Sequence, residues 1–222
     1  MGEDLRFYEL RYDEWLNRLT VMDKTKRGEC ISEKSIKAQV CKYKQVCKEL
    51  VLDCTLPRDC TALFSDMPLL QKVYIGWHFE SYAVQNMCKM FDKCPSLISV
   101  DTYRWDTSNV KDMTAMFRGC ENLEFINMSQ WNTSNVVYLS EMFKGCGKVT
   151  KLGISNWDFS NVQYLEDFLR GCHRLFQAEL NLERDLVFQR KKSTTDILGA
   201  LSRVGTAVVM DKGLYCTEDK YL

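Results

Sequence analysis

Cysteine is the residue type in this chain with the widest chemistry, because a thiolate can act as a nucleophile or bind a metal ion. The sequence holds 11 cysteines but only 2 histidines. Cys94, Cys120, Cys146 and Cys172 recur at a spacing of 26 residues. A zinc site needs ligands that converge on one ion, and the sequence contains no C-x-x-C pair. We therefore predict buried structural thiols, with no metal ligands and no cofactor.

The adjacent residues Cys172 and His173 raise the possibility of a nucleophile paired with its base. Neighbouring residues rarely face one another in a helix or a strand, and no third group is placed to orient the histidine. The sequence also lacks a phosphate-binding glycine loop, an H-E-x-x-H pair and a dinucleotide fingerprint. We predict that the protein is not an enzyme and has no catalytic residues.

The repeated cysteines belong to a longer motif that occurs three times. It reads WDTSNVKDMTAMFRGC from Trp105, WNTSNVVYLSEMFKGC from Trp131 and WDFSNVQYLEDFLRGC from Trp157. A fixed period of about 20 to 50 residues is typical of stacked repeats, in which equivalent positions of neighbouring units lie side by side. We interpret the tryptophans and the cysteines as two buried ladders.

Two degenerate units precede these three. In the unit before Trp105, the apolar and cysteine positions of the motif hold Val84, Met87, Met90, Phe91 and Cys94. Trp77 stands in the tryptophan position, with a two-residue insertion between it and Val84. One step earlier, the same positions hold Pro57, Cys60, Leu63, Phe64 and Met67. We predict five units over residues 51–182.

Each unit is expected to contain one helix and one strand. Val110, Met113, Met116 and Phe117 have helical spacing, and the Asp-Thr-Ser-Asn cluster before them could cap the helix. Gly119 follows the helix, where a left-handed residue is common, as do Gly145 and Gly171. Leu123, Ile126 and Met128 then alternate as in a strand. The predicted fold is an α/β solenoid with a parallel sheet on one face and short helices on the other.

The ends of the chain depart from the repeat. Residues 1–50 show two stretches of apolar residues at helical spacing, which predict an N-terminal helical cap. Residues 183–222 are expected to form a helix–strand cap, with a helix near 197–204 and a strand over Thr206–Met210 followed by a turn. Such end units cover the apolar cross-section of an array.

The repeat resembles the BspA-type leucine-rich repeats of 26 residues, through its Trp, Ser-Asn-Val, Met-Phe and Gly-Cys positions. The resemblance covers roughly residues 50–182. It implies a leucine-rich-repeat solenoid of a kind common in bacterial surface proteins and lipoproteins, and also found in protozoa and large DNA viruses. It further implies adhesion or protein binding and no enzymatic activity.

The composition bears on the class of partner and on the cellular compartment. The 30 basic and 30 acidic residues cancel, so no overall field favours nucleic acid. No apolar run reaches the ~20 residues of a membrane span, and the charged N-terminus does not match a secretory signal. With reduced thiols, these features predict a cytoplasmic protein.

The expected function is non-catalytic protein binding through the concave strand face. Residues that alternate with the buried ones in each strand should point outward. The predicted partner-binding residues are Lys72, Tyr74, Asp101, Tyr103, Phe125, Asn127, Lys151, Gln177 and Glu179. Two alternatives stay open, namely a structural component of a larger assembly and a nucleic-acid-associated protein that uses the lysines of residues 34–48. Partner identity and oligomeric state are not predicted.

Overall fold

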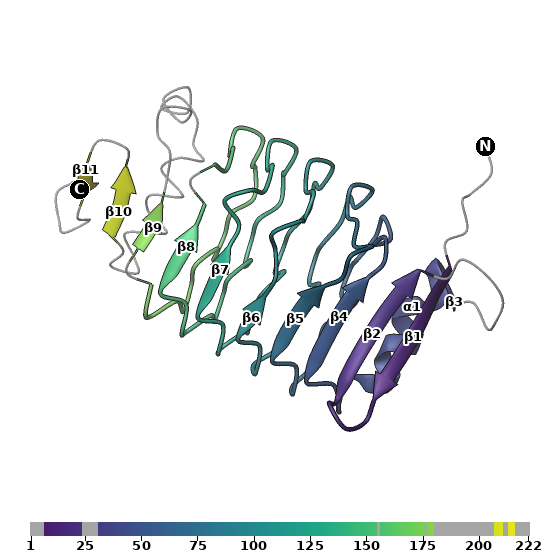
Figure 1. Cartoon of the computed structure of the whole chain (residues 1–222). Coiled ribbons are helices and arrows are strands. Elements are labelled where there is room, and N and C mark those ends of the chain that lie inside the picture. Colours follow the sequence, from purple (N-terminus) through teal and green to yellow (C-terminus); the bar gives the residue numbers. More distant parts are fainter. Residues whose placement is uncertain are drawn as a thin grey trace, which may run out of the picture.

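The computed structural model describes residues 7–23, 31–154, 156–175, 177–179, 207–210 and 213–215. The chain winds as a solenoid in which each coil contributes one strand to a parallel sheet (Figure 1). These strands are β4 (Glu49–Asp53), β5 (Lys72–Ile75), β6 (Ser99–Val100), β7 (Phe125–Asn127), β8 (Lys151–Gly153) and β9 (Gln177–Glu179). Strands β4, β5 and β6 pair in parallel in a first sheet, and β7, β8 and β9 pair in parallel in a second sheet that follows it along the solenoid. The predicted solenoid with a parallel sheet is confirmed.

The register of the strands follows from the apolar alternation. Lys72 pairs with Ser99, and Lys151 lies between Phe125 and Gln177 in the ladder. Their neighbours point inward, and the buried positions are Val73, Val100, Ile126 and Leu152. Because side chains alternate between the two faces of a strand, burying this set turns the other set outward.

The back wall of the solenoid differs from the prediction, because no α-helix forms in the described part of the repeats. Alternate amides there donate to the next coil: Met113 to Tyr138, Ala115 to Ser140, Phe117 to Met142 and Gly119 to Lys144, at 2.8–2.9 Å. Other amides close tight turns within the coil, such as Met116 to Met113 at 3.2 Å. In an α-helix each amide would instead bond four residues back along the chain. The wall is therefore a stack of turns joined by hydrogen bonds between coils.

The polar cluster before each wall does not cap a helix. The hydroxyl of Thr107 donates to the carbonyl of Asn132 in the next coil at 2.9 Å. The side-chain amide of Asn135 donates to the carbonyl of Ser108 in the previous coil at 2.7 Å. These side chains satisfy backbone carbonyls of neighbouring coils, so the Thr-Ser-Asn motif fixes the stacking.

Each turn of the back wall contains two residues with left-handed backbone, four positions apart. Gly119, Gly145 and Gly171 have φ of 71°, 80° and 86°, which confirms the predicted left-handed positions. Asp66 and Lys93 take the same place in the degenerate units with φ of 55° and 57°. A second left-handed residue stands four positions earlier in the chain, and these residues are Ala62, Lys89, Ala115, Glu141 and Asp167.

The core consists of ladders. Ring centroids of Trp105 and Trp131 are 5.9 Å apart, and those of Trp131 and Trp157 are 6.2 Å apart. Phe64, Phe91, Phe117 and Phe143 stack with 5.7 Å between successive centroids. The four repeated cysteines are fully buried beside them. The predicted tryptophan and cysteine ladders are confirmed.

Trp77 does not belong to the tryptophan ladder, so this part of the alignment was wrong. Its side chain is 90% exposed, whereas Phe79 is buried with its ring 5.4 Å from Trp105. Phe79 lies 26 residues before Trp105, which is the period of the repeat. The second unit therefore needs no insertion between the buried ring and Val84.

The N-terminal segment also corrects the prediction. Strands β1 (Phe7–Asp13) and β2 (Arg18–Asp23) form an antiparallel hairpin where a helix was expected, and β2 continues the sheet beside β4. Tyr8, Leu19 and Val21 are buried from this hairpin, a period-two pattern. The second expected helix is shorter, comprising α1 (Glu33–Val40) and the 3-10 turn η1 (Cys41–Tyr43) after the short strand β3 (Ile31–Ser32).

At the other end, β10 (Ala207–Met210) continues the sheet in parallel with β9, and β11 (Gly213–Tyr215) returns antiparallel to it. Strand β10 matches the strand predicted over Thr206–Met210. The helix predicted near 197–204 lies outside the described residues. The first sheet thus ends in the antiparallel strands β1 and β3, and the second ends in the antiparallel strand β11 (Figure 1).

Candidate binding surface

The outward side of strands β4 to β9, with the corners that follow them, is called the sheet face here. Most of the residues predicted to bind a partner lie on it with exposed side chains: Lys72, Tyr74, Asp101, Tyr103 and Asn127. Lys151 is half-buried in β8. Phe125, Gln177 and Glu179 occupy the corresponding backbone positions in β7 and β9. Within their two sheets, the predicted residues of β5, β7, β8 and β9 thus stand in ladder register, while Asp101 and Tyr103 follow β6.

Tyr74 lies in the middle of β5 and is fixed by a charged neighbour. The guanidinium carbon of Arg18 lies 5.8 Å from the Tyr74 ring centroid, within the range of a cation–π contact. Arg18 also pairs with Glu49, its Nη2 lying 2.5 Å from Oε2. The contact places Tyr74 against β2 and β4 and leaves 36% of its surface exposed.

Two larger exposed rings stand at the corner beyond the strands. Trp77 is 90% and Tyr103 is 79% exposed. Each precedes by two residues the buried ring of its own coil, which is Phe79 or Trp105. They therefore occupy equivalent places in neighbouring coils, and the pair is called the aromatic corner below.

Hydrogen bonds fix the backbone beneath the aromatic corner. Arg104 donates through Nη1 to the carbonyl of Gly76 and through Nη2 to the carbonyls of Trp77 and Phe79, at 3.1–3.2 Å. The amide of Tyr103 donates to Oδ1 of Asp101 at 3.2 Å. Arg104 thus joins the coil of Tyr103 to the coil of Trp77.

Gly76 shows how closely this corner is packed. A Cβ on this residue would lie 2.2 Å from Oδ1 of Asp53, so only glycine fits. The same Asp53 oxygen accepts the backbone N–H of His78 at 2.8 Å. The turn from β5 into the corner is therefore set by Asp53 of the preceding coil.

Trp77 is a surface residue that the sequence reasoning missed. Its residue type favours the tryptophan ladder of the core, but the period of 26 residues places Phe79 there. Trp77 stands two residues before the buried Phe79, just as the exposed Tyr103 stands two residues before the buried Trp105. This spacing places Trp77 at the surface.

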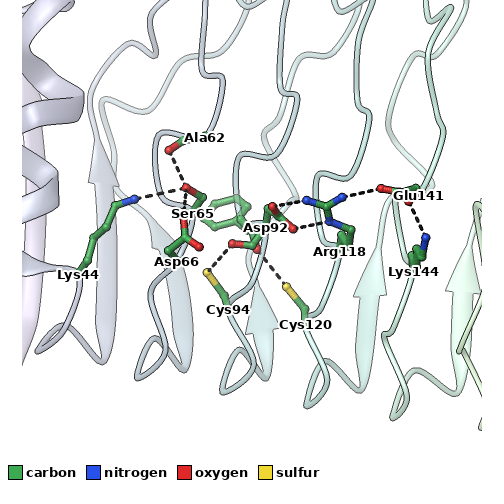
Figure 2. Close-up of polar contacts among 11 residues, drawn as sticks. Lys44, Ala62, Ser65, Asp66, Asp92, Cys94, Arg118, Cys120, Glu141 and Lys144 are labelled. Carbon is green, nitrogen blue, oxygen red and sulfur yellow. Dashed lines mark hydrogen bonds and ion pairs between the residues drawn. The ribbon is translucent and has the colours of Figure 1, made fainter.

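The back wall carries charges that pair between coils (Figure 2). Arg118 binds both carboxylate oxygens of Asp92, at 2.8 and 2.7 Å, and also contacts Glu141 at 2.6 Å. Lys144 bridges Glu141 and Asp167 at 2.6 and 2.7 Å. The Asp92 carboxylate raises the pKa of Arg118, and the Lys144 ammonium lowers the pKa of both Glu141 and Asp167. Since Asp92, Arg118, Glu141, Lys144 and Asp167 all have a charged partner across or within a coil, we interpret this network as structural.

The buried thiols are poorly suited to chemistry. Sγ of Cys94, Cys120, Cys146 and Cys172 donates to the carbonyls of Phe64, Phe91, Phe117 and Phe143, at 3.1–3.3 Å. Burial raises the pKa of Cys94 and of Cys172 to about 12, and raises that of Cys120 and Cys146 well above its ordinary value. A thiolate is the form that attacks carbon or binds metal. These thiols therefore satisfy phenylalanine carbonyls and fill the core.

The part of the chain that the structure describes contains no group of three or more His, Cys, Asp or Glu side chains that could hold a metal ion. Over the same residues, no helix is long and apolar enough to cross a bilayer.

Comparison with known proteins gives one match. A family model described as "Mycoplasma protein of unknown function, DUF285" covers residues 58–186, which include strands β5 to β9. No curated protein and no solved structure matches the chain. The match spans more than half of the sequence and coincides with the repeated coils, which supports a repeat-protein family. The chain accordingly belongs to the family described as Mycoplasma protein of unknown function, DUF285.

Proposed function

We propose that this chain is a non-catalytic repeat module that binds another protein through its sheet face. The observation that carries the proposal is the exposure of Tyr74, Trp77 and Tyr103 on neighbouring coils of one rigid surface. Tryptophan, tyrosine and arginine dominate the energetics of protein interfaces, because large rings bury much area at little entropic cost. Exposed apolar groups that gather on one surface, unlike single scattered ones, are typical of an interaction site.

The stacked core supports the proposal by holding the surface rigid. Tyr74, Asn127 and Lys151 each share a strand with a nearly fully buried neighbour, which is Val73, Ile126 or Leu152. A surface whose side chains are positioned before binding loses less conformational entropy when a partner docks. The resemblance to BspA-type leucine-rich repeats, with their roles in adhesion and protein binding, is consistent with this function.

The proposal assigns no catalytic step and no cofactor to the chain. Burial raises the pKa of Cys120 and Cys146, which disfavours the thiolate form that a nucleophile needs. We also propose a reducing compartment such as the cytoplasm, since the cysteines of the described residues are free thiols. Oxidation in a secretory compartment would be expected to pair exposed thiols.

The function is tested by capture of partners on the immobilised full chain, followed by mass spectrometry and comparison of variants. The double variant Tyr74→Ala/Tyr103→Ala should lower the amount of a specific captured protein at least tenfold, because hot-spot aromatics typically contribute ~2 kcal/mol or more each. Tyr138→Ala is the matched control, because Tyr138 is an exposed tyrosine outside the sheet face. Its side chain is 41% exposed and stacks on Tyr164, with which it forms an isolated β-bridge at the back wall.

Unchanged capture by the double variant, together with loss of capture by Tyr138→Ala, would move the binding surface to the back wall. A structural role in a larger assembly is the alternative, and it predicts self-association. Light scattering at rising protein concentration distinguishes the two, because a monomer at all concentrations contradicts assembly from copies of this chain.

A further inference from the structure

The aromatic corner presents two large rings to solvent on a fixed backbone. Trp77 and Tyr103 are the rings, and Arg104 bonds the coil of one to the coil of the other. The face of an aromatic ring carries a partial negative charge, and tryptophan has the strongest such face. A group that covers these rings is thus favoured if it is flat, apolar or cationic.

The charges around the aromatic corner favour a cationic group over a neutral one. Asp53 lies next to His78, and Asp101 accepts the amide of Tyr103. Two exposed carboxylates follow the buried rings in the chain, Glu80 after Phe79 and Asp106 after Trp105. The amide of Asp106 donates to Oγ of Ser81 at 2.8 Å, which ties it to the coil that contains Glu80.

The basic groups at the corner do not balance these carboxylates. The guanidinium of Arg104 is engaged by the carbonyls of Gly76, Trp77 and Phe79. The His78 ring lies against Asp53, with Nδ1 3.3 Å from each carboxylate oxygen. The surface therefore combines exposed aromatic faces with an excess of negative charge, which attracts cations.

The same sheet face already shows this type of contact in a completed form. Arg18 lies over Tyr74 and pairs with Glu49, so one guanidinium uses a ring face and a carboxylate together. We propose that the aromatic corner receives an arginine or lysine side chain from a basic segment of the partner protein. The cation lies against Trp77 and Tyr103 and its N–H groups bond to the surrounding carboxylates. This inference rests on the proposed function and adds the chemistry of the partner.

The test is a titration of the full chain with a short peptide of alternating arginine and glycine, followed by NMR through the backbone amide resonances of His78 and Tyr103, which are present in every variant. Trp77→Ala should lower the affinity for the arginine peptide about three- to tenfold, the fold-change that corresponds to an exposed cation–π contact. Trp77→Phe should retain part of the affinity, and Glu80→Gln/Asp101→Asn should weaken binding and reduce its dependence on salt.

Trp15→Ala is the matched control, because Trp15 is 96% exposed in the turn between β1 and β2, away from the aromatic corner. It should bind the arginine peptide like the unmodified chain. A peptide of alternating glutamate and glycine should not bind. The proposal is overturned if the arginine peptide fails to bind at millimolar concentration, if Trp77→Ala binds equally well, or if the glutamate peptide binds as tightly.

The two proposals fail in different ways. If capture of a protein partner depends on Tyr74 and Tyr103 but the arginine peptide does not bind, the sheet face is the docking surface and the cationic preference is wrong. If the peptide binds through Trp77 while the tyrosine variants capture the partner normally, the corner takes cations but the sheet face is not the docking surface.

Discussion

Arg118 holds Asp92 of the preceding coil by two parallel hydrogen bonds, Nε to Oδ1 at 2.8 Å and Nη2 to Oδ2 at 2.7 Å. Asp92 is only 5% exposed, and it stands one period of 26 residues before Arg118. The next two coils hold Lys144 and Arg170 at the same place, and both bind Asp167. The repeat period thus places cations in one column, and acidic partners lie in reach of each.

Arg118→Ala is expected to destabilise the fold by about 3 kcal/mol, since it leaves Asp92 charged and poorly hydrated. Asp92→Asn should cost less, because Arg118 is partly exposed and keeps Glu141. Urea denaturation measures both. Arg170→Ala is the control, since a side chain that is 70% exposed should change stability by less than ~0.5 kcal/mol. Equal effects of Arg118→Ala and Arg170→Ala would contradict the interpretation.

The left-handed positions of the wall predict substitutions of opposite sign. Gly145 has φ of 80°, and Gly145→Ala should destabilise by about 1 kcal/mol because a Cβ is disfavoured there. Lys93 has φ of 57° at the equivalent place and is exposed, so Lys93→Gly should stabilise by a few tenths to about 1 kcal/mol. Thermal unfolding of the two variants tests the pair. A fall in melting temperature for both would show that Lys93 contributes more than its backbone strain.

The buried thiols predict a loss of stability in alkali. Burial raises the pKa of Cys94 and Cys172 from 9.0 to about 12, while the same thiols in the unfolded chain ionise near 9. Above pH 9 the unfolded state therefore releases protons that the folded state keeps. Stability is fully present below pH 9 and falls as pH rises toward 12, by about 2 kcal/mol per thiol at pH 10.5.

Denaturation midpoints at pH 8 and pH 10.5 measure this loss. Other groups also titrate in this range, so the informative quantity is the difference between the chain and Cys172→Ala. The variant should be less stable at pH 8 because a cavity forms, yet it should lose less stability than the unmodified chain on going to pH 10.5. Parallel pH profiles of the two proteins would show that Cys172 ionises as readily folded as unfolded.

The sheet could be predicted from sequence because its pattern is local. The alternation through Leu123, Ile126 and Met128 fixes which residues point inward, so the positions of Tyr74 and Tyr103 followed from spacing alone. The left-handed glycines followed from residue type. The hairpin over residues 7–23 was missed because Tyr8 and Tyr12 suit a helical period as well as an alternating one.

The back wall could not be predicted in the same way. Met113, Met116 and Phe117 are buried as expected, but that spacing is shared by a helix and by a chain of tight turns. The two are distinguished by where the amides donate, and Met113 and Phe117 donate to carbonyls 25 residues away. Such partners are set by stacking between coils, which a local pattern does not contain. Trp77 was predicted to be buried because it is a tryptophan, although the spacing of 26 residues from Tyr103 places it at the surface.

The last prediction concerns the indoles of the tryptophan ladder, which differ in one hydrogen bond. Nε1 of Trp157 donates to the carbonyl of Met128 at 3.0 Å, whereas Nε1 of Trp131 is buried and has no hydrogen-bond partner in the described part of the chain. Both side chains are nearly fully buried and stack on each other at 6.2 Å, so the apolar area lost on substitution by phenylalanine is similar.

Trp157→Phe removes a satisfied hydrogen bond and leaves the Met128 carbonyl with the backbone amide of Trp131 as its remaining donor, whereas Trp131→Phe removes a polar group that is already unsatisfied. Trp157→Phe should therefore destabilise by about 1 kcal/mol more than Trp131→Phe in chemical denaturation. Trp105→Phe serves as a further control, since Nε1 of Trp105 donates to the carbonyl of Asp101 at 2.8 Å and its loss should resemble that of Trp157. If Trp131→Phe lowers stability more than the other two substitutions, the Trp131 indole N–H makes a hydrogen bond in solution, for example to a buried water.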